Sequence, residues 1–333
     1  MEIILSPKCG IMHTSVPRGL SPPGVARPQT KGEIKMARTR RIKFSDRDAL
    51  HHVTSRISGR QMLLAGAGVK DDMLVALERA AEFSGVNVGA FAILDNHFHV
   101  VVQVPFHEGA VPEGEVLRRY GALMGEKALK RLEARLSGLR RGGGPAAAEA
   151  ELDRLRARMH DLSQFVKTFK EEFGRLFRRR RPYPGTLWEG RFRSTLVGGA
   201  EYLRRCAAYV ELNPVRAGLS SRADGYAWNT VGAARRGSAF AARCRKWLLS
   251  VLGLAGGDSP LGGGDSPLRE AALARRVVQF SVGKILGSAA FVAQMLGVFA
   301  ERVRSRSARA REVDGVGFAS HGWRLAAKLS GAA

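Results

Sequence analysis

Two apolar segments separated by a short polar turn constrain the fold of this chain more than any other feature. Residues 86–94 (VNVGAFAIL) and 97–104 (HFHVVVQV) have the length and the valine-rich composition of β-strands. Asp95 and Asn96 lie between them and favour a tight turn. The two segments therefore predict a β-hairpin.

The elements expected around this hairpin indicate a fold class. A strand over 50–57 and a helix over 70–83 precede it, and a helix over 161–177, a strand over 191–197 and a helix over 200–213 follow it. The order strand, helix, strand, strand, helix, strand is that of a split βαβ unit. We therefore expect an α+β, ferredoxin-like domain with an antiparallel sheet. Helices should cover one face of this sheet, and the other face should be open to a ligand.

The N-terminal residues differ from the rest of the chain. Residues 1–40 are rich in proline and glycine, so we expect them to be disordered. The alternative is that translation begins at Met36, which opens the basic segment MARTRRIKF. In that case the preceding residues are absent from the native product.

Composition also indicates the remaining domain boundaries. The ferredoxin-like domain is expected over 45–235, and a charged helical pattern at about 113–160 predicts an inserted helical hairpin. Residues 236–270 contain the near-repeat GGDSPL and are expected to be a linker. A helical accessory region is expected over 271–333.

The charge of the chain indicates a polyanionic partner. The formal net charge is +24, from 54 lysines and arginines against 30 aspartates and glutamates. Such an excess repels itself in a compact protein and attracts polyanions, which favours nucleic acid. Acidic lipid and a compositional bias of the genome are the alternatives.

Cysteine and membrane signals favour a cytoplasmic protein, and a nucleic-acid partner would place it at the nucleoid. Cys9, Cys206 and Cys244 are too few and too scattered for a disulfide framework or a zinc knuckle. The longest apolar stretch, 285–300, is interrupted by Gln294 and is too short to cross a bilayer, so no membrane partner is expected. The N-terminus lacks the basic segment and long apolar core of a signal peptide.

The second strand of the hairpin carries two histidines on one face. Alternate side chains of a strand share a face, so His97 and His99 point the same way, opposite the fully apolar set. Two neutral imidazoles at this separation form half of a divalent-metal site. Two ordinary surface histidines are the alternative that the spacing leaves open. For His51 and His52, in the first strand, a structural role or DNA contact is expected rather than metal ligation.

The helix over 200–213 presents a tyrosine and an amide together. Tyr202, Cys206, Tyr209 and Asn213 fall on one stripe, at offsets of four, three and four. Tyr209 offers a phenol that could attack an electrophile, and Asn213 an amide oxygen one turn later. The alternative is a purely structural helix, in which Tyr209 packs against the fold and Asn213 ends the helix before Pro214. The residue before proline is biased out of the helical region, so Asn213 is the less constrained of the two.

These segments together resemble a known family. DNHFHVVV resembles the His-hydrophobic-His motif, and LWEGRFRSTLV with EYLRRCAAYVELNPVRAGL resembles the second half of the single-tyrosine transposases that carry this motif. A tyrosine four residues before an Asn-Pro-Val triplet is typical of the REP-associated tyrosine transposases. Here it is Tyr209, and the triplet begins at Asn213. The resemblance covers roughly residues 45 to 235, where VTSRISGR and LSQFVKTFKEEF are also similar to blocks of the family.

The resemblance implies a mechanism, a metal and a partner. Tyr209 would attack a phosphodiester of single-stranded DNA, form a 5′-phosphotyrosine and release a 3′-hydroxyl. His97 and His99 would bind Mg²⁺ or Mn²⁺, and Asn213 matches the family's third ligand. The DNA would be palindromic and folded into hairpins. Members of the family often act as dimers, which leaves a homodimer open.

Five arginines flank the expected site and would meet DNA phosphates, which makes affinity dependent on salt. Ordinary surface charge is the alternative for each of them. They are Arg191, Arg193, Arg204, Arg205 and Arg216.

Two hypotheses of different class follow. The first is an active, metal-dependent transposase that nicks and rejoins single-stranded DNA. The second is a non-catalytic regulator that keeps the fold and binds nucleic acid, with RNA still open as a partner. The presence of His97, His99 and Tyr209 together favours the first, because a protein that only binds has no need of all three.

Overall fold

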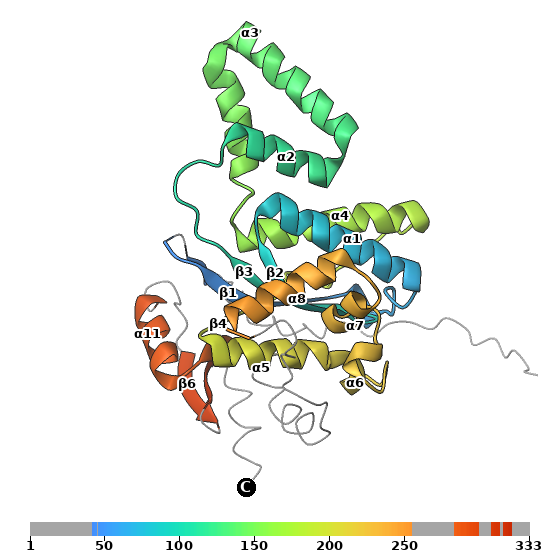
Figure 1. The fold of residues 1–333 in the computed structure, drawn as a ribbon, viewed down its shortest axis with the longest axis vertical. Helices are drawn as coiled ribbons and strands as arrows, with labels where there is room; N and C mark the ends of the chain where they lie inside the picture. The colour runs from blue at the N-terminus through green and yellow to red at the C-terminus, as the bar shows by residue number, and fades with distance from the viewer. Residues whose placement is uncertain (1–41, 45, 255–282, 300–307, 314–315, 322–333) are drawn as a thin grey trace, which may run out of the picture. The chain divides into compact units, whose positions relative to one another are not determined.

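The computed structural model describes residues 42–44, 46–254, 283–299, 308–313 and 316–321 (Figure 1). The expected N-terminal extension, 1–40, lies outside the described residues. The strands are β1 (Ala49–Arg56), β2 (Asn87–Ile93), β3 (His97–Val104), β4 (Arg193–Val197), β5 (Gly283–Gly287), β6 (Ala308–Val313) and β7 (Val316–His321). The α-helices are α1 (Ala67–Ser84), α2 (Glu113–Met124), α3 (Glu126–Arg156), α4 (Leu162–Arg180), α5 (Ala200–Glu211), α6 (Asn213–Arg216), α7 (Thr230–Arg235), α8 (Ala239–Val251) and α11 (Ala289–Phe299). Two short 3₁₀ turns, η1 (Ser58–Arg60) and η2 (Ala223–Gly225), complete them.

The strands form one sheet in the order β2-β3-β1-β4-β5-β7-β6. The first four strands pair antiparallel, as the split βαβ order predicts, and the α+β fold class is confirmed. The sheet as a whole is mixed rather than antiparallel, because β5 pairs in parallel with β4. The expected helical region over 271–333 contributes α11 but also β5, β6 and β7. β5 pairs with the edge strand β4, β7 pairs with β5, and β6 pairs with β7, so each of these segments gains backbone hydrogen bonds as a strand.

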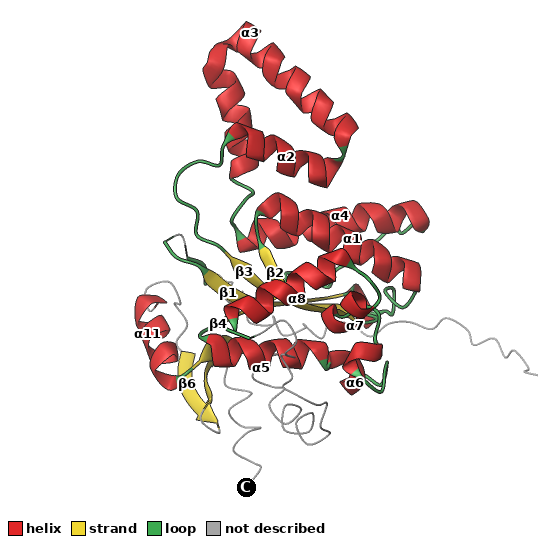
Figure 2. Cartoon of the chain, viewed as in Figure 1, coloured by secondary structure: helices red, strands yellow, loops and turns green. Residues whose placement is uncertain are grey.

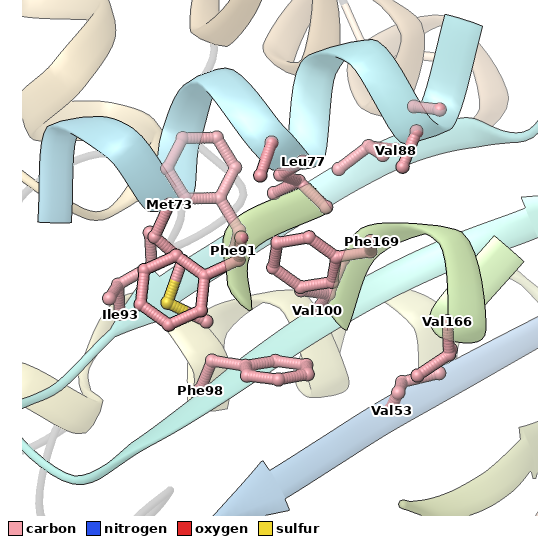
Figure 3. Packing of buried hydrophobic residues seen from close by; sticks show 14 of the residues in the cluster. Val53, Met73, Leu77, Val88, Phe91, Ile93, Phe98, Val100, Val166 and Phe169 are labelled. Atoms are coloured by element: carbon pink, nitrogen blue, oxygen red, sulfur yellow. The ribbon is translucent and has the colours of Figure 1, made fainter. Parts of the chain in front are cut away.

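One face of the sheet packs against α1 and α4. Phe91, Phe98 and Val100 point from the strands toward Met73 of α1 and Phe169 of α4 (Figure 3). The rings of Phe98 and Phe169 meet edge to face, with centroids 5.0 Å apart. This apolar layer fixes β3, and so determines which of its side chains face the other way.

The opposite face is covered by α5, which corrects the expectation of an open face (Figures 1 and 2). Leu203 and Cys206 of α5 pack on Ala92 of β2 and Val101 of β3. The physical reason lies in β2, where every residue after Asn87 is buried. A strand that is apolar on both faces needs cover on both.

The inserted helical hairpin is present as α2 and α3. Gly144 has φ 75° within α3, next to Pro145, and this interrupts the helix at the expected Gly-Pro break. The hairpin has its own apolar cluster, which includes Val116, Leu136 and Leu152. None of the described helices is both long and apolar enough to span a bilayer.

The expected linker, 236–270, begins with a folded segment. Residues 239–251 form α8, which Ser238 caps by accepting a hydrogen bond from the Ala241 amide at 3.2 Å. Phe240 and Leu248 of this helix are buried. The linker prediction is therefore wrong for α8, and residues 255–270 lie outside the described residues.

Asp161 caps the N-terminus of α4, and its removal should destabilise the domain. Its Oδ1 accepts hydrogen bonds from the amides of Ser163 at 2.8 Å and Gln164 at 2.9 Å. Asp161→Ala should lower the free energy of unfolding by about 1 kcal/mol, measured by chemical denaturation. Asp161→Asn keeps a side-chain oxygen as acceptor and should lose less free energy of unfolding, although it removes the ion pair with Lys43 at 2.6 Å. Equal losses in both variants would contradict the capping role.

His51 should make stability fall as the pH is lowered. Burial, with the nearby charge of Lys43, lowers the pKa of His51 from 6.5 to about 4. The folded state therefore resists protonation that the unfolded state accepts, so stability is full above pH 6.5 and declines as the pH falls toward 4. Between neutral pH and about pH 4.5 the free energy of unfolding should fall by about 2 kcal/mol less in His51→Leu than in the unaltered protein. Denaturation curves at the two pH values measure it, and an unchanged difference would contradict it.

Candidate active site

A cavity of about 480 Å³ lies where β1, β3 and the start of β4 meet α5 and α6. It is the meeting point of segments far apart in the chain, because β1 pairs with both β3 and β4. Its lining is almost entirely polar. The lining residues are Thr54, Ser55, Arg56, Arg60, His97, His99, Glu189, Gly190, Arg191, Arg193, Tyr209, Asn213 and Arg216.

Both histidines of β3 line this cavity. The His97 and His99 rings are 5.1 Å apart between centroids and nearly perpendicular, at 73°. Burial, with the charge of Arg56, lowers the pKa of His97 to about 4, and burial also places the pKa of His99 well below its ordinary value. Both rings are therefore neutral at pH 7, which is the form that binds a metal.

Each of these histidines has its Nδ1 atom engaged by a neighbour. Nδ1 of His97 lies 2.6 Å from Oδ1 of Asn96, and Nδ1 of His99 lies 2.9 Å from Nε2 of His52. Asn96 is itself held by donating from Nδ2 to the Arg60 carbonyl at 3.1 Å. These bonds leave Nε2 of both histidines as the nitrogen available to a ligand.

Tyr209 projects from α5 against the same histidines. Its ring meets His99 edge to face at 5.6 Å between centroids, and the Arg216 guanidinium lies 5.3 Å from the ring centroid. Tyr209 is 3% exposed and lines the cavity. This packing holds the ring in one orientation.

Asn213 lies one turn after Tyr209 and is buried at the start of α6. Its Nδ2 donates to the Tyr209 carbonyl at 2.8 Å, which fixes the amide plane. The following proline does not fray the chain here, because Pro214 occupies the first turn of a new helix, where its missing amide hydrogen costs nothing.

The five predicted arginines fall into two groups in the structure, one at the cavity and one outside it. Arg191, Arg193 and Arg216 line the cavity. Arg204 and Arg205 do not; they pair with Glu201 on the outer side of α5, at 3.5 and 2.7 Å. The reason is helical spacing, because three and four residues separate them from Glu201.

Two cavity arginines were missed by the sequence analysis. Arg56 lies opposite His97 in the β1–β3 register, and Arg60 follows in η1 with φ 57°, an uncommon conformation for a residue other than glycine. The place of Arg56 depends on the pairing of β1 with β3, and that of Arg60 on the turn that follows β1; the sequence analysis predicted neither. The lining of this cavity contains five arginines against one carboxylate, Glu189. The cavity therefore concentrates positive charge.

The donor set fits a divalent ion. The described residues contain no group of three histidine, cysteine, aspartate or glutamate side chains able to hold a metal. A metal ion held by His97 and His99 would need a further ligand, and Asn213, whose side chain carries an amide oxygen, lines the same cavity. Two imidazoles and one amide would suit Mn²⁺ better than Mg²⁺.

Comparisons with known proteins find similarity among solved structures. No family model matches the chain, and no curated protein matches it. A solved structure of a REP-associated tyrosine transposase bound to a REP hairpin is similar over 61% of this chain and 87% of that chain, with 14% sequence identity and a TM-score of 0.37.

Proposed function

We propose that this protein is a DNA strand transferase, a transposase that cleaves and rejoins single-stranded, hairpin-containing DNA through a covalent bond to Tyr209. The observation that carries the proposal is the convergence of Tyr209, two neutral histidines and five arginines on one cavity. A protein that only binds nucleic acid needs the arginines but neither the neutral histidines nor an oriented phenol.

The proposed reaction is an in-line displacement at phosphorus. The Tyr209 oxygen forms a bond to the phosphorus as the bond to the 3′ oxygen breaks. The phenol loses its proton to solvent, and the leaving 3′ oxygen takes one up as a hydroxyl. A second 3′-hydroxyl then reverses the step and joins a new strand, so the energy of the phosphodiester is conserved and no nucleotide cofactor is required.

The cavity residues would have three different roles: metal binding, orientation of the DNA and positioning of the nucleophile. His97, His99 and Asn213 would hold Mg²⁺ or Mn²⁺, which when bound supplies positive charge to the phosphate oxygens. Arg56 and Arg216 line the same cavity as the histidines and would orient the DNA backbone. Packing of Tyr209 against His99 keeps the nucleophile in place before DNA arrives.

Covalent capture tests the proposal. Single-stranded hairpin oligonucleotides from the flanks of the gene are incubated with the protein and Mn²⁺ and resolved on a denaturing gel. A shifted band that requires metal supports the transferase. Binding without any adduct, across several flank-derived hairpins, would favour the regulator, for which the charge of the cavity is sufficient.

The expected homodimer and the expected association with the nucleoid remain predictions.

The cavity arginines should contribute more to DNA binding than those outside it. Arg193→Ala should weaken hairpin binding several-fold and reduce the slope of log affinity against log salt by about 1, because one phosphate contact is lost. Arg204→Ala is the matched control, since Arg204 is also exposed but pairs with Glu201 outside the cavity. Fluorescence anisotropy over a salt series measures both. Equal slopes for the two variants would contradict the assignment of DNA to this cavity.

A further inference from the structure

We infer that His52 is a positioning residue for the proposed site: it holds His99 in one tautomer and supports the ring of Tyr209. This inference rests on the proposed function. His52 lies outside the segment that carries His97 and His99, and sequence spacing alone gives it no such role.

His52 touches two proposed functional groups at once. Its Nε2 is 2.9 Å from Nδ1 of His99, and the two ring planes are only 8° from parallel with centroids 5.1 Å apart, so the rings meet edge to edge as an in-plane hydrogen bond requires. Its ring also meets that of Tyr209 edge to face, with centroids 5.8 Å apart. His52 is 1% exposed, so no water competes for these contacts.

The backbone places His52 rigidly. It lies in β1, where it is paired with Val101 of β3 on one side and Thr195 of β4 on the other. A residue paired on both sides cannot move without breaking two ladders. The preceding residue, His51, is just as buried but points to the opposite face of the sheet.

The hydrogen bond dictates a tautomer. For Nε2 of His99 to bind a metal it must carry a lone pair, so the proton of the neutral ring sits on Nδ1. That proton is donated to Nε2 of His52, which must then accept. Outer partners of this kind fix the orientation of a ligating histidine and typically account for 10–100-fold in metal affinity.

A neutral imidazole in this role also preserves the charge of the site. The usual outer partner of a ligating histidine is a carboxylate or a carbonyl. A carboxylate would place a negative charge next to the ion and offset part of the attraction for phosphate. His52 orients His99 without adding that charge.

Mn²⁺ affinity tests the role, measured by electron paramagnetic resonance on the full chain. His52→Leu removes the acceptor at similar volume and should weaken binding at least 10-fold. His52→Gln returns an oxygen near the position of Nε2 and should restore affinity to within about 3-fold of the unaltered protein. His51→Leu is the matched control for loss of a buried histidine from the same strand, and its affinity should not change.

A second readout is independent of affinity. In the Mg²⁺-loaded protein, nitrogen NMR should find the His99 proton on Nδ1 and Nε2 of His52 unprotonated. Normal Mn²⁺ binding by His52→Leu would overturn the inference. Equal loss of Mn²⁺ affinity in His52→Gln and His52→Leu would also overturn it. Failure of the unaltered protein to bind Mn²⁺ is a different result, because it removes the metal site of the proposed function itself.

Discussion

Tyr209→Phe should lower formation of the covalent protein–DNA adduct by at least roughly 10³-fold, because it removes the attacking oxygen. The ring stays, and with it the contacts to His99 and Arg216, so hairpin affinity should change by less than about 3-fold. A denaturing gel measures the adduct, and anisotropy measures binding on the same samples.

The matched control is Tyr202→Phe. Tyr202 lies two turns earlier on α5, where the Arg205 guanidinium is 5.8 Å from its ring centroid, and it does not line the cavity. Its variant should form adduct at the rate of the unaltered protein. Adduct formation by Tyr209→Phe at that rate would show that another group is the nucleophile.

Replacing both cavity histidines should have an effect of similar size. His97→Gln with His99→Gln leaves a single proposed ligand side chain, Asn213, so Mn²⁺ binding should be lost and the adduct should fall at least roughly 10³-fold. Hairpin binding should persist, because the arginines of the cavity are unchanged.

Chelation and a third histidine serve as controls. Removing divalent ions from the unaltered protein should reproduce the double variant, and adding Mn²⁺ back should restore only the unaltered protein. His107→Gln changes an exposed histidine that stacks on His160, with centroids 4.8 Å apart, away from the cavity. It should bind Mn²⁺ normally. Adduct formation by the double variant in the presence of chelator would contradict a metal role for the histidines.

Local patterns predicted the central elements of the fold well. The strand over 97–104 is observed with those bounds, and the break at Gly144 interrupts α3 where the sequence indicated. Such features depend on neighbours in the chain, which is why periodicity and turn residues suffice. The cover of the second sheet face and the pairing of β5 with β4 depend on partners far along the chain, which periodicity does not report.

The candidate site also combines features set by neighbours in the chain with features set by distant segments. Tyr209 and Asn213 are four residues apart on a helical stripe, and the structure places both at the cavity, as the spacing predicts. Arg56 reaches it only through strand register, and Arg204 is turned away by its helical position beside Glu201. Side chains whose place depends on pairing between distant strands could not be assigned from the sequence.

The most direct measurement is the position of the covalent bond. The protein is reacted with a hairpin oligonucleotide and Mn²⁺, digested with nuclease and protease, and its peptides are analysed by mass spectrometry. Our expectation is a nucleotide phosphate on the peptide that contains Tyr209, and on no other tyrosine. An adduct on a different residue, or none from hairpins that bind tightly in Mn²⁺, would contradict it.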